Sequence, residues 1–268
     1  MIDVPVTDGP GTVWSPLAVG AWMAAAILTG IAIAVLSSRH PGPTQPGTAR
    51  GTWRRLPAAA AGASLLAASC LGLRDPLASM AQYTLALMVL GQVVPPFLLL
   101  ARPGKAGGAA SPTGWLRDPG VAAVLFGGLA IVTGLPAVLD RSLANALFSA
   151  PLGLLDLLAG LLFWAQVLPG TRIIRSNPGA GLYALLGGVP MTVVAVVWMT
   201  APRVLYAPYL DVLCRWDLTP LQDQHWAGFI MLVAGLPLQV AGAWLLVAPT
   251  PEREKGPPCP TCGSRASP

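Results

Sequence analysis

The stretch LTPLQDQHWAGFIMLVAGLPL, residues 218–238, places four consecutive polar side chains beside an apolar, glycine-containing segment. From Trp226 the apolar character continues to residue 248, which is long enough to cross a hydrocarbon core of about 30 Å as a helix. The rest of the chain has the same character. Of its 268 residues, 54% are hydrophobic and 10% are charged, whereas soluble domains carry about 25% charged residues. We therefore predict an integral membrane protein.

Six further apolar segments have a length suited to membrane crossing. The predicted fold is an all-α bundle of seven transmembrane helices in one domain, residues 1–249, followed by a flexible cytoplasmic tail, residues 250–268. The expected spans are at about 14–37, 56–73, 79–101, 120–139, 143–168, 181–201 and 226–248. Only Asp140, Arg141 and Ser142 separate the fourth span from the fifth, which predicts a tight hairpin there.

The basic residues predict how this bundle is oriented. Most of the 16 Lys and Arg residues fall in one set of alternate connections, namely Arg39, Arg50, Arg54, Arg55, Arg102, Lys105, Arg117, Arg172, Arg175, Arg253, Lys255 and Arg265. The opposite set holds only Arg74, Arg141, Arg203 and Arg215. Lys and Arg in short loops stay in the cytoplasm, so the N-terminus is expected outside and the C-terminus inside. The net charge of +5 then reflects membrane topology and not binding to nucleic acid.

The outer ends of three predicted spans carry soft metal ligands. These candidates are Met80, Met199, His225 and Met231. Thioethers and imidazole suit Cu(I), but methionine is also a common filler of hydrophobic cores, so both interpretations stay open.

Other polar groups are expected at the same outer level. Asp223 and Gln224 are suited to cap the helix that starts at Trp226, and Gln82 lies near the start of the third span. Tyr206 and Tyr209, in the outer loop 203–224, fit either an interfacial aromatic belt or a docking surface.

A second polar layer is expected deeper in the membrane. Asp156, Gln92 and Gln239 each lie about 20 Å below the outer surface, at 1.5 Å of helix rise per residue. A charged Asp near the midplane is costly, so we expect Asp156 to face the bundle and to bond Gln92 or Gln239. The alternative is a protonated Asp156 that only holds helices together.

The cysteines and histidines limit the chemistry. Cys259 and Cys262 in the tail form a C-x-x-C pair, which is half of a thiol site for a soft metal, or an incidental feature of a flexible tail. His40 and His225 are the only histidines and are predicted on opposite sides of the membrane, so they cannot clamp a haem. No H-E-x-x-H motif is present. An enzyme is not expected.

Four stretches resemble one known family, the CtaG-type cytochrome c oxidase assembly proteins. They are VVPPFLLLARP (93–103), LLAGLLFWAQVL (157–168), VPMTVVAVVWMTAPRVLYAPYL (189–210) and PLQDQHWAGFIM (220–231). The resemblance implies a multi-pass protein of the bacterial plasma (inner) membrane. It also implies a role in maturing the copper centre of a haem-copper oxidase through transient handling of Cu(I). Oxidase subunits or a periplasmic copper carrier would be its partners.

The resemblance has gaps where metal ligands are expected. Members of the family usually carry a histidine near the start of the third span, but here that stretch has Ser79, Met80, Gln82 and Tyr83. Two other functions therefore stay open. A transporter of small solutes or metal ions would use helices broken at Pro190 or at the Pro95–Pro96 pair to expose backbone. The second open function is that of a protein that docks on the oxidase without binding a metal.

Overall fold

The computed structural model describes residues 49–73, 76–101, 115, 118–144, 146–168, 174, 176–209 and 218–248. The first predicted span (14–37), the Pro/Gly-rich stretch at 102–114 and the tail with Cys259 and Cys262 lie outside these ranges. The described residues are helical, without any strand. The elements are α2 (Ala49–Gly72), α3 (Met80–Met88), the π-helical turn η1 (Val89–Val93), α4 (Val94–Ala101), α5 (Pro119–Gly134), α6 (Pro136–Ala144), α7 (Ala146–Val167), α8 (Asn177–Thr200), the short 3-10 turn η3 (Ala207–Tyr209) and α9 (Pro220–Val247).

Four helical stretches in the described part are long and apolar enough to cross a membrane. They are Met80–Ala101, Ala150–Val167, Asn177–Thr200 and Pro220–Val247. Two shorter apolar helices, Leu56–Gly72 and Pro119–Gly134, coincide with the second and fourth predicted spans. The all-α class predicted from composition is confirmed for the part of the chain described.

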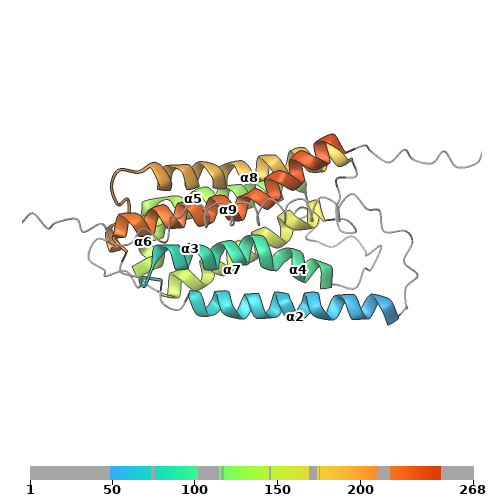
Figure 1. Cartoon of the computed structure of the whole chain (residues 1–268), viewed down its shortest axis with the longest axis horizontal. Helices are drawn as coiled ribbons and strands as arrows, with labels where there is room; N and C mark the ends of the chain where they lie inside the picture. Colours follow the sequence, from blue (N-terminus) through green and yellow to red (C-terminus); the bar gives the residue numbers. More distant parts are fainter. Residues whose placement is uncertain are drawn as a thin grey trace, which may run out of the picture.

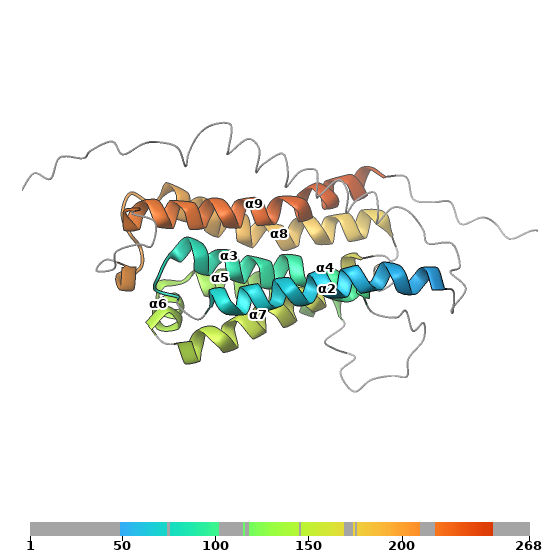
Figure 2. The same ribbon diagram turned by 60° about the horizontal axis from the view of Figure 1, so that its bottom comes forward.

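The helices lie with their long axes roughly parallel in one elongated bundle (Figures 1 and 2). α8 packs along α9, α2 lies against α4, α3 lies against α9, and α5 contacts both α7 and α8. Glycines allow a close approach between α8 and α9. A Cβ atom added at Gly181 would lie 2.6 Å from the carbonyl oxygen of Gly242. Small residues at such contacts are typical of helix pairs in membranes, where van der Waals packing replaces the hydrophobic effect.

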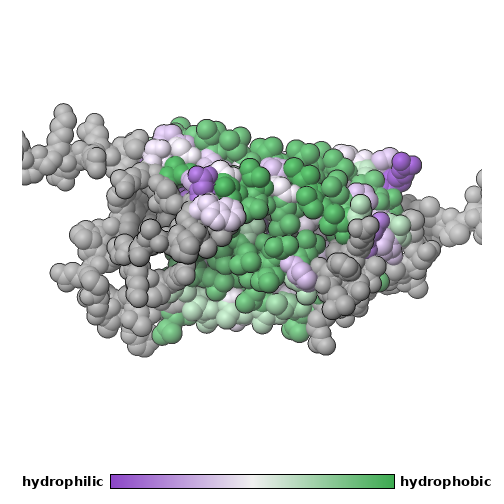
Figure 3. Space-filling model, turned by 180° about the vertical axis from the view of Figure 1, so that it is seen from behind, coloured by the Kyte–Doolittle hydropathy of each residue, from purple (hydrophilic) through white to green (hydrophobic). Residues whose placement is uncertain are grey.

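The outside of the bundle is apolar. Large aliphatic side chains on α5, α7 and α8 are about half exposed or more, among them Val124, Leu154, Leu155, Leu186 and Val193. Figure 3 shows the resulting broad apolar area over the middle of the molecule. An apolar patch of this extent on a monomer marks a surface that another apolar phase covers. For a chain of this hydropathy, that phase is lipid.

The predicted hairpin at residues 140–142 is wrong. The fourth span ends at Gly134, and Asp140, Arg141 and Ser142 lie within the helix α6. The chain turns at Leu135, whose backbone is extended (φ −78°, ψ 132°). Pro136 causes this, because a proline disfavours the helical conformation of the residue before it. The short helix α6 therefore lies at one end of the bundle, between α5 and α7 (Figure 2).

The seventh span begins earlier than predicted, at Pro220 instead of Trp226. Thr219 is its N-cap, and a capping box with Gln222 completes its first turn: Gln222 N–H donates to Thr219 Oγ1, and Thr219 N–H donates to Gln222 Oε1. The prediction that Asp223 and Gln224 cap this helix is therefore wrong. Both lie inside its first turns, and their side chains reach other elements.

The Pro95–Pro96 pair does not break the third span. These prolines lack the N–H groups that would pair with the carbonyls of Gly91 and Gln92, and the chain responds with the π-helical turn η1 just before them. The helix continues from Met80 to Ala101. The broken helix expected of a transporter is thus not found at this position.

Candidate functional site

One end of the bundle holds a buried polar junction. We call this end, where α3 and α9 begin and α8 finishes, the cap end. Asp223 on α9 is 1% exposed, and its carboxylate accepts hydrogen bonds from Ser79 Oγ (2.7 Å), Met80 N–H (2.6 Å) and Ala81 N–H (3.3 Å). The two amides belong to the first turn of α3, where free N–H groups and the positive end of the helix dipole attract a carboxylate. Asp223 therefore caps α3.

The two neighbours of Asp223 reach two further segments. Gln224 is fully buried, and its Oε1 accepts from Leu205 N–H (2.8 Å) while its Nε2 donates to the Trp198 carbonyl (3.3 Å). His225 is half-buried, with Nε2 3.1 Å from the Ala201 carbonyl oxygen. Three consecutive side chains of α9 thus fix the start of α3, the end of α8 and the segment after α8.

Tyr206 and Tyr209 belong to the same junction. Tyr206 is fully buried and its hydroxyl donates to the Gly134 carbonyl (2.7 Å), while Tyr209 is 1% exposed and donates to the Pro76 carbonyl (2.7 Å). Burial raises the pKa of Tyr206, so its hydroxyl stays a neutral donor. Neither side chain is available as an interfacial belt or a docking surface, so both of those interpretations are wrong for these two tyrosines.

Of the four predicted metal ligands, Met80, Met199 and His225 lie at the cap end, and Met231 lines a cavity deeper in the bundle. Met80 is buried at the start of α3, beside Asp223, and Met199 packs against Gly228. His225 lies at Ala201. Gln82 is half-buried, and its backbone N–H donates to the capping oxygen of Ser79 (3.2 Å). Among these candidates only Met231 lines the internal cavity of the bundle.

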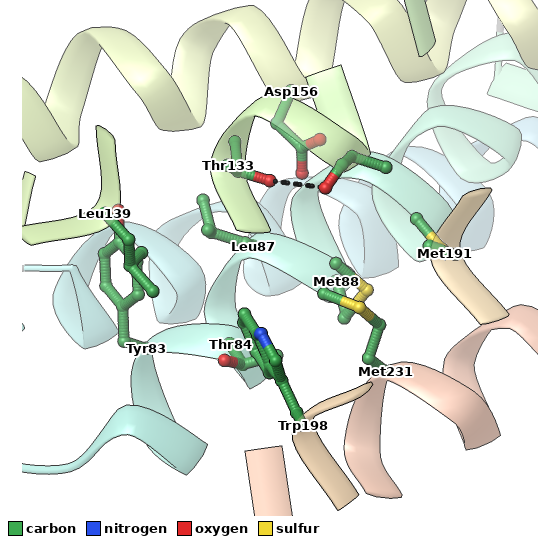
Figure 4. Close-up of a pocket in the computed structure, with 11 residues that line it drawn as sticks. Tyr83, Thr84, Leu87, Met88, Thr133, Leu139, Asp156, Met191, Trp198 and Met231 are labelled. Carbon is green, nitrogen blue, oxygen red and sulfur yellow. Dashed lines mark hydrogen bonds between the residues drawn. The ribbon is translucent and has the colours of Figure 1, made fainter. Parts of the chain in front are cut away.

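That cavity, which we call the methionine pocket, is lined by three thioethers from three helices. Met88 on α3, Met191 on α8 and Met231 on α9 are each at most 5% exposed. Figure 4 shows the sulfur ends of Met88 and Met231 directed toward each other, with Met191 on the same side of the pocket. The other lining residues are Tyr83, Thr84, Leu87, Ala130, Thr133, Leu139, Asp156 and Trp198. The cavity volume is about 10 Å³, close to the room that one water molecule needs.

The three methionines share one level in the bundle. Each lies about 12–17 Å along its helix from the cap end, at 1.5 Å per residue. Sequence reasoning placed Met231 nearer the surface because it started the helix at Trp226. It missed Met88 and Met191, although Met191 lies in VPMT and Met231 in GFIM, inside two of the motifs quoted above.

Asp156 faces the interior of the bundle, as predicted, and lines the same pocket. It is 7% exposed, and its Oδ2 has no hydrogen-bond partner among the described residues. The expected bond to Gln92 or Gln239 is wrong. Gln92 Nε2 donates to the sulfur of Met191 (3.1 Å), and Gln239 Nε2 donates to Thr192 Oγ1. Oδ2 of this buried side chain therefore has no polar partner in the described part of the chain, in a cavity lined by three thioethers.

The π-helical turn shapes this side of the pocket. It begins directly after Met88 and contains Gly91 and Gln92. A Cβ atom at Gly91 would lie 2.7 Å from Asp156 Oδ2, so only glycine leaves room for the carboxylate there. Across the contact, a Cβ at Gly160 would lie 2.3 Å from the Gly91 carbonyl oxygen, which Pro95 leaves without its usual helical donor.

This donor set favours a soft cation. Within the described ranges, no group of three or more His, Cys, Asp and Glu side chains could hold a metal ion. Thioethers bind Cu(I), whereas Zn²⁺ prefers thiolates and imidazoles, and Mg²⁺ and Ca²⁺ prefer oxygen. The pocket can therefore bind a monovalent soft ion or serve as ordinary core packing, and no histidine is among its lining residues.

The fold and the buried site together define a polytopic helical membrane protein with a sulfur-lined interior. A family model described as cytochrome c oxidase caa3 assembly factor (Caa3_CtaG) matches residues 31–250, which is most of the chain. The chain belongs to this family of cytochrome c oxidase assembly factors. Searches of curated proteins and of solved structures found no match.

Proposed function

We propose that this protein helps to mature the copper centre of a haem-copper cytochrome c oxidase. The observation that carries the proposal is the family match over residues 31–250. The methionine pocket supports it, because three thioethers in a buried cavity are chemically suited to Cu(I), the form of copper that soft sulfur ligands select. The proposed role is that of a helper without catalysis, which the description of the family as an assembly factor supports.

The proposal includes a location and an orientation. The protein spans the bacterial plasma (inner) membrane seven times, with the N-terminus outside and the C-terminus in the cytoplasm. The unequal distribution of Lys and Arg between alternate connections supports this. The cap end then faces the outside, and the methionine pocket lies below it within the membrane. Copper would be exchanged at the cap end with oxidase subunits or with a periplasmic copper carrier.

The test is deletion of the gene, followed by measurement of oxidase activity and of the oxidase's copper content with and without added copper. We expect deletion to lower both quantities and added copper to restore them in part, because a high copper concentration bypasses a delivery step. Normal activity of the deletion strain in both media would contradict a role in assembly. Low activity of an oxidase with full copper content would retain assembly and rule out the copper step.

A further inference from the structure

We infer that the methionine pocket is a Cu(I) site, with Met88, Met191 and Met231 as thioether ligands and Asp156 as the compensating negative charge. The inference deepens the proposed function by naming the residues that would hold the metal, and rests on it for the biological role of the metal. It differs from the outer set of His225, Met80 and Met199, none of which lines this pocket.

The arrangement of the three sulfur atoms is the first argument. The three ligands come from three helices, α3, α8 and α9, and meet at one cavity of about 10 Å³. Met88 and Met231 point toward each other across it (Figure 4). Because α3 and α8 both pack on α9, the helix contacts themselves set the spacing of the ligands. Such ligands on packed helices are held more rigidly than ligands on loops.

Charge is the second argument. Three neutral thioethers leave Cu(I) with its full positive charge, which is unfavourable inside a membrane unless an anion is near. Asp156 lines the same cavity, is 93% buried and has a carboxylate oxygen without a partner among the residues described. A cation bound beside it would remove the cost of burying each charge alone. If the three methionines only filled the core, a buried carboxylate beside them would have no role in that packing.

The surroundings of the ligands form the third argument. Gln92 Nε2 donates to the sulfur of Met191, which orients that thioether and leaves its second lone pair available. Groups that orient metal ligands in this way commonly tune the affinity of the site. Gly91 leaves the space that Asp156 Oδ2 occupies. The π-helical turn thus contributes to the placement of Met88, Gln92 and Asp156 at once.

The test is titration of the full-length protein in detergent with Cu(I), under anaerobic reducing conditions and against bicinchoninate as competing chelator. All four cysteines are first replaced by serine, since thiolates also bind Cu(I). The test variant is M88L/M191L/M231L and the matched control is M80L/M199L. Leucine is close to methionine in volume, so both variants should keep the fold. Thermal unfolding and monodispersity check this.

We expect the cysteine-free protein to bind one Cu(I), the test variant to lose this binding and the control to keep it unchanged. Asp156→Asn should weaken the affinity by about 10–100-fold, the usual effect of removing a group that supports metal ligands. X-ray absorption at the copper edge should show sulfur neighbours, which only methionine can supply in this protein. If the triple variant fails to fold, the same measurement on M80L/M199L still tests the assignment, because unchanged sulfur neighbours there exclude the methionines of the cap end.

Several results would overturn the inference: no binding by the cysteine-free protein, equal binding by M88L/M191L/M231L, loss of binding in M80L/M199L, or copper surrounded only by nitrogen and oxygen. The proposed function and the proposed site can be contradicted independently of each other. A copper-dependent oxidase defect on deletion without Cu(I) binding would retain the function and remove the site. Cu(I) binding at the three methionines with normal oxidase assembly would retain the site and remove the function.

Discussion

Asp223, Gln224 and His225 show what a single residue does in this protein. Each reaches a different segment, and Asp223 bonds three donors at the start of α3 that are more than 140 residues earlier in the chain. The sequence marks these residues because polar groups are rare in it. From the sequence, we predicted that Asp223 and Gln224 cap the helix in which they lie, because capping follows a local pattern. Their true partners depend on how helices pack, which no local pattern contains.

Replacing Asp223 with alanine should be costly. The change leaves Ser79 Oγ and the N–H groups of Met80 and Ala81 without this acceptor inside the protein. We expect a loss of about 1–3 kcal/mol for each donor left buried and unsatisfied. The matched control is Asp118→Ala, which removes a solvent-exposed N-cap of α5 that accepts from Gly120 and Val121 and should cost about 1 kcal/mol. Thermal unfolding in detergent measures both. Equal losses would contradict the role of Asp223 as a cap between helices.

At the scale of helices, the hydropathy pattern predicted where the helices lie, but it was less accurate for the residues at which they begin and end. The second through seventh predicted spans all correspond to helices. The errors lie at Leu135, where a proline moves the turn, and at Thr219, where the capping box T-P-L-Q moves the start of α9. Both signals are local and were present in the sequence. The π-helical turn was not predictable in this way, because Pro95 and Pro96 allow either a break or a widened turn, and the local sequence does not select between them.

The contact between the π-helical turn and α7 leads to a second stability prediction. Gly160→Ala would place a Cβ atom 2.3 Å from the Gly91 carbonyl oxygen, so the helices must move apart. We expect a loss of about 1–3 kcal/mol, as for other overpacked sites, together with weaker Cu(I) binding. Gly128→Ala is the matched control, since a Cβ there meets nothing within 4 Å. It should leave stability unchanged or raise it by about 0.5–1 kcal/mol. If both variants unfold at the same temperature, the close contact is not a constraint.

For the whole molecule, composition was sufficient to predict the class. A chain with 10% charged residues and mean hydropathy of +0.64 has no way to solvate its surface in water, and the described part is an apolar helical bundle. The methionine pocket is different. Met88, Met191 and Met231 lie far apart in sequence, and only the packing of α3 and α8 on α9 brings them together. Methionine spacing alone could not distinguish them from Met80 and Met199.

The orientation of the molecule is open to a direct test. In a cysteine-free background, we expect Ala207→Cys, an exposed position at the cap end, to react with a membrane-impermeant maleimide in intact spheroplasts. Ser176→Cys, exposed at the opposite end of α8, should react only after the membrane is opened. Ser176 makes no side-chain capping bond, so its replacement should not disturb the helix. The reverse labelling pattern would place the cap end in the cytoplasm and rule out copper exchange on the outer side.

The long separation between Asp223 and α3 also has a consequence for biosynthesis. A ribosome makes the chain from its N-terminus, so α3 enters the bilayer while α9 is still to be translated. Until then, the leading amides of α3 have only Ser79 and water to bind. These amides gain the Asp223 carboxylate as acceptor only after α9 has been made. A chain that stops before α9 therefore lacks this cap at the start of α3.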